Sequence, residues 1–229
     1  MSRSSSPVNR KASAKAPRSR GKVERAAIKS SAAAFLVDKG NYRHFMAKEI
    51  HEQPEVVGHT LAHYLDMACE RVRLPANLSF DFSALERVSI AACGTAYYAG
   101  LVAKYWFERF ARLPVEIDVA SEFRYREAPL KAGGLAIFVS QSGETADTLA
   151  SLRYAKEHKQ HTVAVANVAT STIARESDAV MPTLAGPEIG VASTKAFTCQ
   201  LSALCCLAIH AGARAASCPR TTSASWCAH

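Results

Sequence analysis

Between residues 87 and 212, short apolar runs alternate with longer stretches in which apolar residues recur at helical spacing. The short runs are typical of strands buried on both faces, and the longer stretches are typical of covering helices. The pattern predicts strands at 87–93, 115–120, 135–140, 161–167 and 179–184, and helices at 95–113, 146–158, 172–177 and 193–212. Repeated strand–helix units imply parallel crossovers. We therefore expect an α/β fold, an open, doubly wound parallel sheet of about five strands.

A helical segment precedes this sheet. From Tyr42 to about Ala68, apolar residues fall near helical spacing, with Pro54 as a break or as the first turn of a second helix. The stretch 73–85 has the character of a connector. Residues 34–85 are thus predicted to be a helical lead-in to a domain at 86–212.

The two ends of the chain differ from this middle part in composition. Residues 1–33 are mostly Ser, Ala, Lys, Arg and Pro without an apolar period, which predicts a disordered basic segment. Residues 213–229 mix Ser, Thr, Cys and Pro without a period, which predicts an unstructured, divergent tail. A frameshift or a truncated gene would explain such a tail.

The net charge of +8 does not belong to the predicted domain. Residues 1–29 hold nine Lys and Arg against one acid, and the rest of the chain carries 19 basic and 19 acidic groups. The predicted domain therefore has no electrostatic bias toward nucleic acid. No run approaches the roughly 18 apolar residues of a membrane helix, and the seven cysteines lack zinc-ligand spacing. We expect a cytoplasmic protein with reduced thiols and with no metal or cofactor.

Candidate chemistry lies in loops that follow strands and open helices. These loops are 93–96, 140–145, 170–172 and 190–194, and they are rich in Gly, Ser and Thr. In an open α/β sheet, ligands bind beyond the carboxyl ends of the strands, and helix N-termini there offer unpaired N–H groups. Without Lys or Arg in the loops, such a site suits a small phosphorylated molecule. Each loop alone is better explained as an ordinary helix cap, so the prediction depends on the convergence of three or four of them at one sheet edge.

At these loops the sequence resembles the glutamine–fructose-6-phosphate aminotransferase (isomerising) family. The similarity runs from about Val23 to Gly212 and is carried by "DKGNYRHFMAKEIHEQP", "ACGTAYYAG", "ASEFRYRE", "VSQSGETADTLASLR" and "GPEIGVASTKAFTCQL". These motifs are similar to the first sugar-isomerase (SIS) subdomain of that family. The resemblance implies a part in making glucosamine 6-phosphate from fructose 6-phosphate and glutamine, in amino-sugar biosynthesis. It also implies a homodimer formed through SIS surfaces.

The resemblance also assigns residues. It implies that the substrate is bound by Cys93, Gly94, Thr95, Ser140, Gln141, Ser142, Thr145, Val191 and Ser193. It assigns no catalytic residue to this chain, because the family's glutaminase domain and second SIS subdomain are expected to lie outside it. Glu144 is the only carboxylate that we expect close to the phosphate, and Lys195, in a first helical turn, is expected to point outward.

Three functions stay open from the sequence. The chain is the phosphosugar-binding half of such an aminotransferase, an SIS-type sugar-phosphate sensor joined to a basic arm, or a non-functional gene fragment. A sensor of the SIS type carries a helix-turn-helix domain ahead of the sugar-binding part. Residues 1–33 are too short and too poor in apolar residues to form one.

Overall fold

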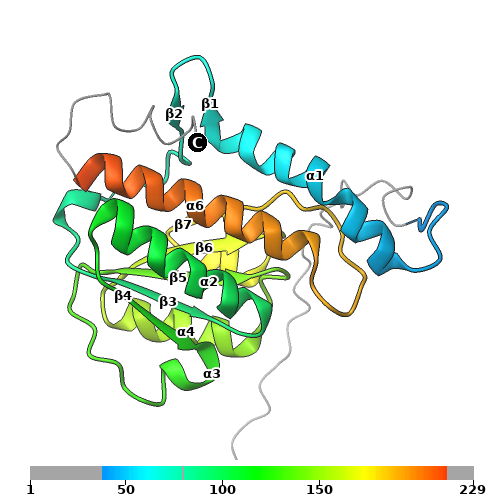
Figure 1. Cartoon of the computed structure of the whole chain (residues 1–229). Helices are drawn as coiled ribbons and strands as arrows, with labels where there is room; N and C mark the ends of the chain where they lie inside the picture. Colours follow the sequence, from blue (N-terminus) through cyan, green and yellow to red (C-terminus); the bar gives the residue numbers. More distant parts are fainter. Residues whose placement is uncertain (1–37, 79, 216–229) are drawn as a thin grey trace, which may run out of the picture. The chain divides into compact units, whose positions relative to one another are not determined.

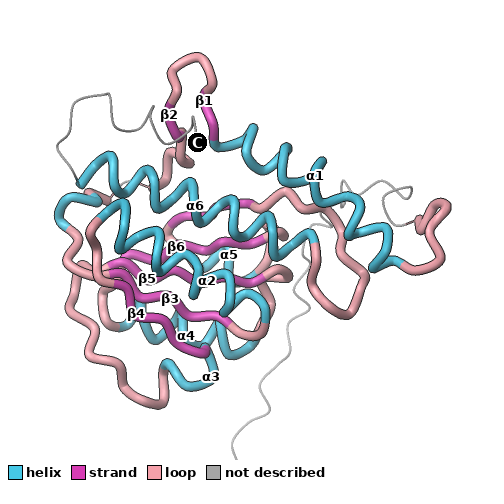
Figure 2. The backbone as a smooth tube through the Cα atoms, viewed as in Figure 1, coloured by secondary structure: helices cyan, strands magenta, loops and turns pink. Residues whose placement is uncertain are grey.

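The computed structural model describes residues 38–78 and 80–215, so the predicted disordered segment and residues 216–229 lie outside the described part. The described residues belong to the unit Ala32–His229, one of the two into which the chain divides. Five parallel strands form the central sheet: β3 (Val88–Ala92), β4 (Val115–Val119), β5 (Leu135–Ser140), β6 (His161–Ala166) and β7 (Ala179–Pro182). Their order is β4-β3-β5-β6-β7, and Figure 2 shows them between two helical layers. The predicted α/β fold is confirmed.

Helices cover both faces of the sheet, as Figure 1 shows. The helices are α1 (Phe45–Tyr64), α2 (Thr95–Trp106), α3 (Ala120–Phe123), α4 (Ala146–Glu157), α5 (Thr172–Glu176) and α6 (Lys195–Ala215). Along β3, Val88 and Ile90 pack in the core that α2 and α6 share, whereas Ala91 packs in the core under α3, α4 and α5. Successive strand residues point to opposite faces, so a sheet covered on both sides needs apolar residues at every position. This explains why the strands appear as continuous apolar runs.

The lead-in contains one long helix and not a broken one. Helix α1 passes through Pro54 without interruption, which corrects the predicted break. Proline cannot donate to the carbonyl four residues earlier, that of Ile50. The Gln53 side chain supplies the missing donor, with its Nε2 3.1 Å from the Ile50 carbonyl oxygen.

The rest of the lead-in has more structure than a connector. After α1 the chain forms a small antiparallel hairpin of β1 (Leu65–Asp66) and β2 (Arg71–Val72), and then a 3₁₀ turn, η2 (Phe82–Ala84). The Tyr64 hydroxyl donates to the Pro182 carbonyl at 2.7 Å, so the end of α1 is tied to the end of β7. The lead-in is therefore part of the same folded unit as the sheet.

Helix α6 departs from the expectation that no segment reaches membrane length. By length and composition alone, Lys195–Ala213 is apolar enough to cross a bilayer. More than half of that stretch is buried inside the fold, where α6 packs against the sheet, α1 and α2. In Figure 1, α1 lies along the outer side of α6. Burial on several sides accounts for the apolar character of this helix.

The end of α6 lies very close to the turn that follows α2. The predicted helix 95–113 is α2 followed by a π-helical turn, η3 (Phe107–Ala111), and the next residue, Arg112, is left-handed with φ 55°. A Cβ on Gly212 would lie 2.5 Å from the carbonyl oxygen of Phe110. Because the obstacle is backbone, only glycine fits at this contact.

This contact gives a paired prediction about stability. We expect Gly212→Ala to destabilise the protein by about 1–3 kcal/mol, since the added methyl overpacks against backbone. Gly58 lies in the middle of α1, and a methyl added there would meet no atom within 4 Å apart from the backbone of its own helix and its chain neighbours. Gly58→Ala should therefore stabilise the protein by about 0.5–1 kcal/mol through helix propensity. Chemical denaturation measures the free energy of unfolding of both variants. Equal changes in the two variants would contradict the prediction.

Candidate functional site

A cavity of about 270 Å³ opens at the carboxyl ends of β3 and β5. The starts of α2 and α4 and the loop before α6 meet there. Its lining residues are Cys93, Thr95, Ala96, Val139, Ser140, Gln141, Ser142, Thr145, Glu188, Gly190, Val191, Ser193 and Gln200. Four loops were predicted to converge at one edge of the sheet, and three of them, 93–96, 140–145 and 190–194, contribute lining residues.

The loop after β5 is held in shape by its own hydrogen bonds. The buried hydroxyl of Ser140 accepts from the Gly143 N–H at 3.0 Å and lies 2.9 Å from the Thr145 hydroxyl. Gly143 has a φ of 67°, and a Cβ there would overlap the Ser171 hydroxyl. The Ser142 hydroxyl oxygen accepts from the backbone N–H of Glu144 at 3.2 Å. The loop therefore presents its polar groups in a fixed geometry before any ligand arrives.

The helices that open into the cavity have no side-chain cap. The N-cap residues of α2 and α4 are Gly94 and Thr145, and neither makes a capping hydrogen bond from its side chain. In contrast, the Ser171 hydroxyl accepts from the Ala174 N–H and caps α5, which lies outside the cavity. Uncapped first turns carry N–H groups and partial positive charge, which attract an anion.

Helix α6 is capped by a carboxylate from the preceding loop. Glu188 Oε1 accepts from the N–H groups of Thr194 and Ala196 at 2.9 and 3.1 Å, and its Oε2 accepts from the Ser193 hydroxyl at 3.1 Å. The start of α6 thus already holds a negative charge. The cavity is therefore lined by residues at two uncapped helix starts and by the Glu188 carboxylate.

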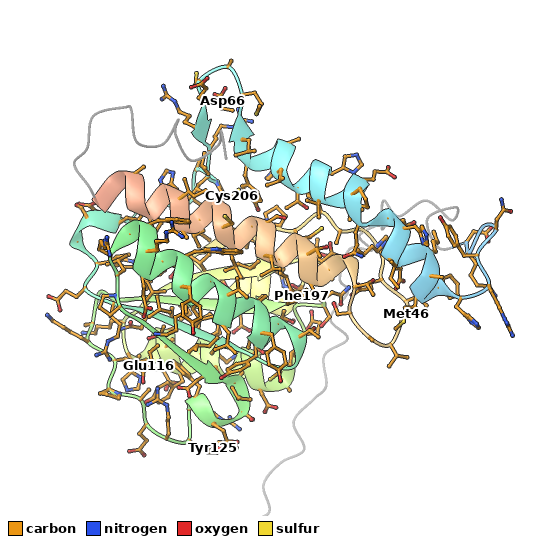
Figure 3. The ribbon with its side chains drawn as sticks, viewed as in Figure 1. Met46, Asp66, Glu116, Tyr125, Phe197 and Cys206 are labelled. Atoms are coloured by element: carbon orange, nitrogen blue, oxygen red, sulfur yellow. The ribbon has the colours of Figure 1, made fainter. Side chains whose placement is uncertain are left out.

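The loop that carries Glu188 is held by α1. The Glu49 side chain is only 2% exposed, and its Oε1 accepts from the N–H groups of Ile189 and Gly190 at 2.5 and 3.1 Å. In Figure 3 the labels Met46 and Phe197 mark the starts of α1 and α6, the two helices that hold this loop. The lead-in therefore positions one wall of the cavity.

Lys195 does not point outward, which corrects the expectation drawn from its place in a first helical turn. Its side chain is 4% exposed and donates to Glu52 Oε2 of α1 at 2.7 Å. Burial alone raises the pKa of the Glu52 carboxyl, but the hydrogen bond and charge of Lys195, with the charge of Lys48, outweigh it and hold that pKa below its ordinary value of 4.5. The pair joins α1 to α6, and Lys195 is not among the lining residues.

Glu144 does not line the cavity, which corrects the expectation that it is the carboxylate close to the phosphate. Its Oε1 accepts from the Thr172 N–H at 2.7 Å, and this hydrogen bond is the main reason that the pKa of Glu144 is lowered. The fourth predicted loop, 170–172, lies behind Gly143, whose carbonyl accepts from the Ile173 N–H at 3.0 Å. Glu144 and this loop therefore support the loop after β5 from outside, and Glu188 faces the cavity.

The structure brings together all but one of the residues assigned by resemblance. Gly94 is the exception: it is the N-cap of α2 and has a φ of 59°, a backbone role rather than a lining one. Ala96 and Gly190 also line the cavity and lie in the predicted loops, whereas Val139, Glu188 and Gln200 lie outside those loops and were missed. Within residues 38–78 and 80–215, no group of three or more His, Cys, Asp or Glu side chains could hold a metal ion.

Comparisons with known proteins agree with this geometry. The family model of the SIS domain matches residues 82–210. The chain is 76% identical over 190 residues to glutamine–fructose-6-phosphate aminotransferase (isomerising) of Bradyrhizobium diazoefficiens, a match that covers 83% of this chain and 31% of that protein. The corresponding Rhizobium meliloti protein is 67% identical over 190 residues, with the same coverage of 83% and 31%. The chain thus spans less than a third of the length of these curated relatives.

Solved structures show the same likeness. The C-terminal domain of glucosamine-fructose-6-phosphate aminotransferase from Francisella tularensis superposes with a TM-score of 0.76 at 42% identity, over 82% of this chain and 53% of that chain. Glucosamine-6-phosphate deaminase of Thermotoga maritima, at 24% identity and a TM-score of 0.60, shares the fold over 75% of this chain and 50% of its own. The resemblance inferred from the loop motifs is confirmed.

The anchoring of the cavity wall by α1 is testable. We expect Glu49→Ala to destabilise the protein by about 1–3 kcal/mol, because two backbone N–H groups lose their acceptor in a partly buried place. Amide hydrogen exchange at Ile189 and Gly190 should become faster. Glu55→Ala, on the exposed side of the same helix, is the control and should change stability by less than about 0.5 kcal/mol. Unchanged exchange in Glu49→Ala would contradict this anchoring role.

Proposed function

The chain belongs to the SIS domain family, and we propose that its cavity binds a small sugar phosphate, with fructose 6-phosphate and glucosamine 6-phosphate as the first candidates. The observation that carries the proposal is the pair of uncapped helix starts, those of α2 and α4, that open into one polar cavity. A phosphate placed there accepts from backbone N–H groups and from the hydroxyls of Ser142 and Thr145. The Glu188 carboxylate, which also lines the cavity, repels a phosphate. The ligand therefore binds in one orientation.

The relatives suggest the biological setting. The proteins that match the chain, of which the matched residues make up 31%, are named for the amination and isomerisation of fructose 6-phosphate. We propose that this chain corresponds to the sugar-phosphate-binding half of their isomerase part and serves amino-sugar biosynthesis in the cytoplasm. A homodimer through SIS surfaces is part of the same proposal.

Binding should depend on the phosphate and on two hydroxyls. Each neutral hydrogen bond contributes about 1 kcal/mol net, so we expect Ser142→Ala combined with Thr145→Ala to weaken fructose 6-phosphate binding by about tenfold or more. Calorimetry measures the affinity. Thr170→Ala removes an exposed hydroxyl from the neighbouring loop outside the cavity and is expected to bind like the unchanged chain. Equal affinity for fructose and fructose 6-phosphate would rule out the phosphate assignment.

We expect binding without turnover from this chain alone. Moving a proton between neighbouring carbons requires a positioned acid–base group. Among the described residues, the one carboxylate that lines the cavity is that of Glu188, which already accepts hydrogen bonds from Ser193, Thr194 and Ala196. No Lys or His is among the described lining residues.

The assay incubates the purified chain with fructose 6-phosphate, with and without glutamine or an ammonium salt. Neither glucose 6-phosphate nor glucosamine 6-phosphate should form above the level of a heat-inactivated control. Turnover that disappears on Glu188→Gln would show that this half of the protein carries its own base and would overturn the expectation.

A further inference from the structure

One lining residue has a polar group that the described part of the protein leaves unpaired. Gln200, in the second turn of α6, is 2% exposed and lines the cavity. Its amide oxygen, Oε1, is buried and has no hydrogen-bond partner among residues 38–78 and 80–215. The other buried side-chain oxygen without a partner in that part of the chain is Thr148 Oγ1, and Thr148 does not line the cavity.

An unpaired buried carbonyl needs an explanation. Leaving a buried acceptor without a donor costs about 1–3 kcal/mol, so native proteins rarely keep one unless a ligand or water completes it. The surroundings on α6 do not demand a polar side chain, because the neighbouring buried residues Cys199, Ala203 and Leu204 are all apolar in character. A methionine of similar length would fill the same space without the cost. Packing alone therefore does not explain the amide at Gln200. We look for its hydrogen-bond donor in a ligand bound in the cavity.

The chemistry of that partner follows from the acceptor. An amide carbonyl accepts hydrogen bonds, and the ester phosphate of a sugar phosphate, which is mostly a dianion at neutral pH, has only acceptor oxygens as well. The phosphate therefore cannot satisfy Oε1, whereas a sugar hydroxyl can donate to it. Gln200 lies on α6, and Glu188 and Ser193 of the adjoining loop also line the cavity, whereas the uncapped helix starts are those of α2 and α4.

We propose that Gln200 is a specificity-determining residue whose carbonyl accepts a hydrogen bond from a hydroxyl of the sugar, apart from the phosphate-binding loop. This inference rests on the proposed function, since it assigns a second contact within the same cavity. The carbonyl of Gln200 therefore receives a hydrogen bond only when a sugar phosphate is bound. Inorganic phosphate occupies the helix starts and leaves the carbonyl unpaired.

The test compares Gln200→Met with Gln160→Met in the full chain. Gln160 is also a buried glutamine, but its Nε2 donates to the carbonyls of Lys131 and His158 at 2.7 and 3.2 Å, away from the cavity. Calorimetry with fructose 6-phosphate and with inorganic phosphate measures binding, and thermal unfolding of the ligand-free proteins measures Tm. We expect Gln200→Met to weaken fructose 6-phosphate binding roughly five- to hundredfold, the equivalent of about 1–3 kcal/mol, and to leave phosphate binding unchanged. Its Tm should stay level or rise, whereas Gln160→Met should lower the Tm and leave both affinities unchanged.

Several outcomes would overturn the inference. Equal weakening of both ligands by Gln200→Met would mean that the residue only shapes the cavity, and an unchanged affinity for fructose 6-phosphate would mean that it makes no contact. A fall in Tm as large as that of Gln160→Met would show that the carbonyl is already bonded in the ligand-free protein. Failure of the unchanged chain to bind either ligand would overturn the proposed function together with this contact, whereas normal binding by both the unchanged chain and Gln200→Met overturns the contact alone.

Discussion

The first turn of every helix has backbone N–H groups that must find an acceptor, and the candidate site is defined by how this fold distributes those acceptors. Several helices begin at the same edge of the parallel sheet. Helix α5 is capped by the hydroxyl of Ser171 and by the carboxylate of Glu144, and α6 is capped by Glu188. The N-caps of α2 and α4 make no such side-chain bond. The positive ends of these two helices remain available to an external anion, and the cavity lies where they meet.

Carboxylates of the protein build the scaffold around that site. Glu49 and Glu52 of α1 hold the cavity loop and the base of α6, and Glu188 fixes the turn between that loop and α6. Each carboxylate is paired with backbone N–H groups or with a buried lysine, as a charge withdrawn from water requires. A helix that the sequence presents as a lead-in therefore belongs to the architecture of the site.

Glycines with positive φ and an unpaired buried carbonyl occur together at the cavity. Gly94 and Gly143 adopt positive φ values in the two loops after β3 and β5, and Gly143 leaves no room for a side chain. Gln200, on α6, buries an unpaired carbonyl and lines the same cavity. Away from the cavity, β3 and β5 are buried along their whole length by apolar packing. A buried carbonyl without a partner on an otherwise well-packed fold is typical of a binding site, where a ligand contact compensates for its cost.

The sequence by itself determined the strands, their parallel arrangement and the loops after β3 and β5, because apolar period, glycine and hydroxyl caps act through neighbouring residues. It also placed Cys93, Ser142 and Val191 near one another through motif resemblance, and these residues do line one cavity. Only the tertiary structure decided where the charged side chains point. Lys195 turns inward because α1 brings Glu52 to it, and Glu144 turns away because α5 begins beside it. A side chain's direction depends on elements distant in the chain, so no local pattern could distinguish Glu188 from Glu144 or identify Gln200.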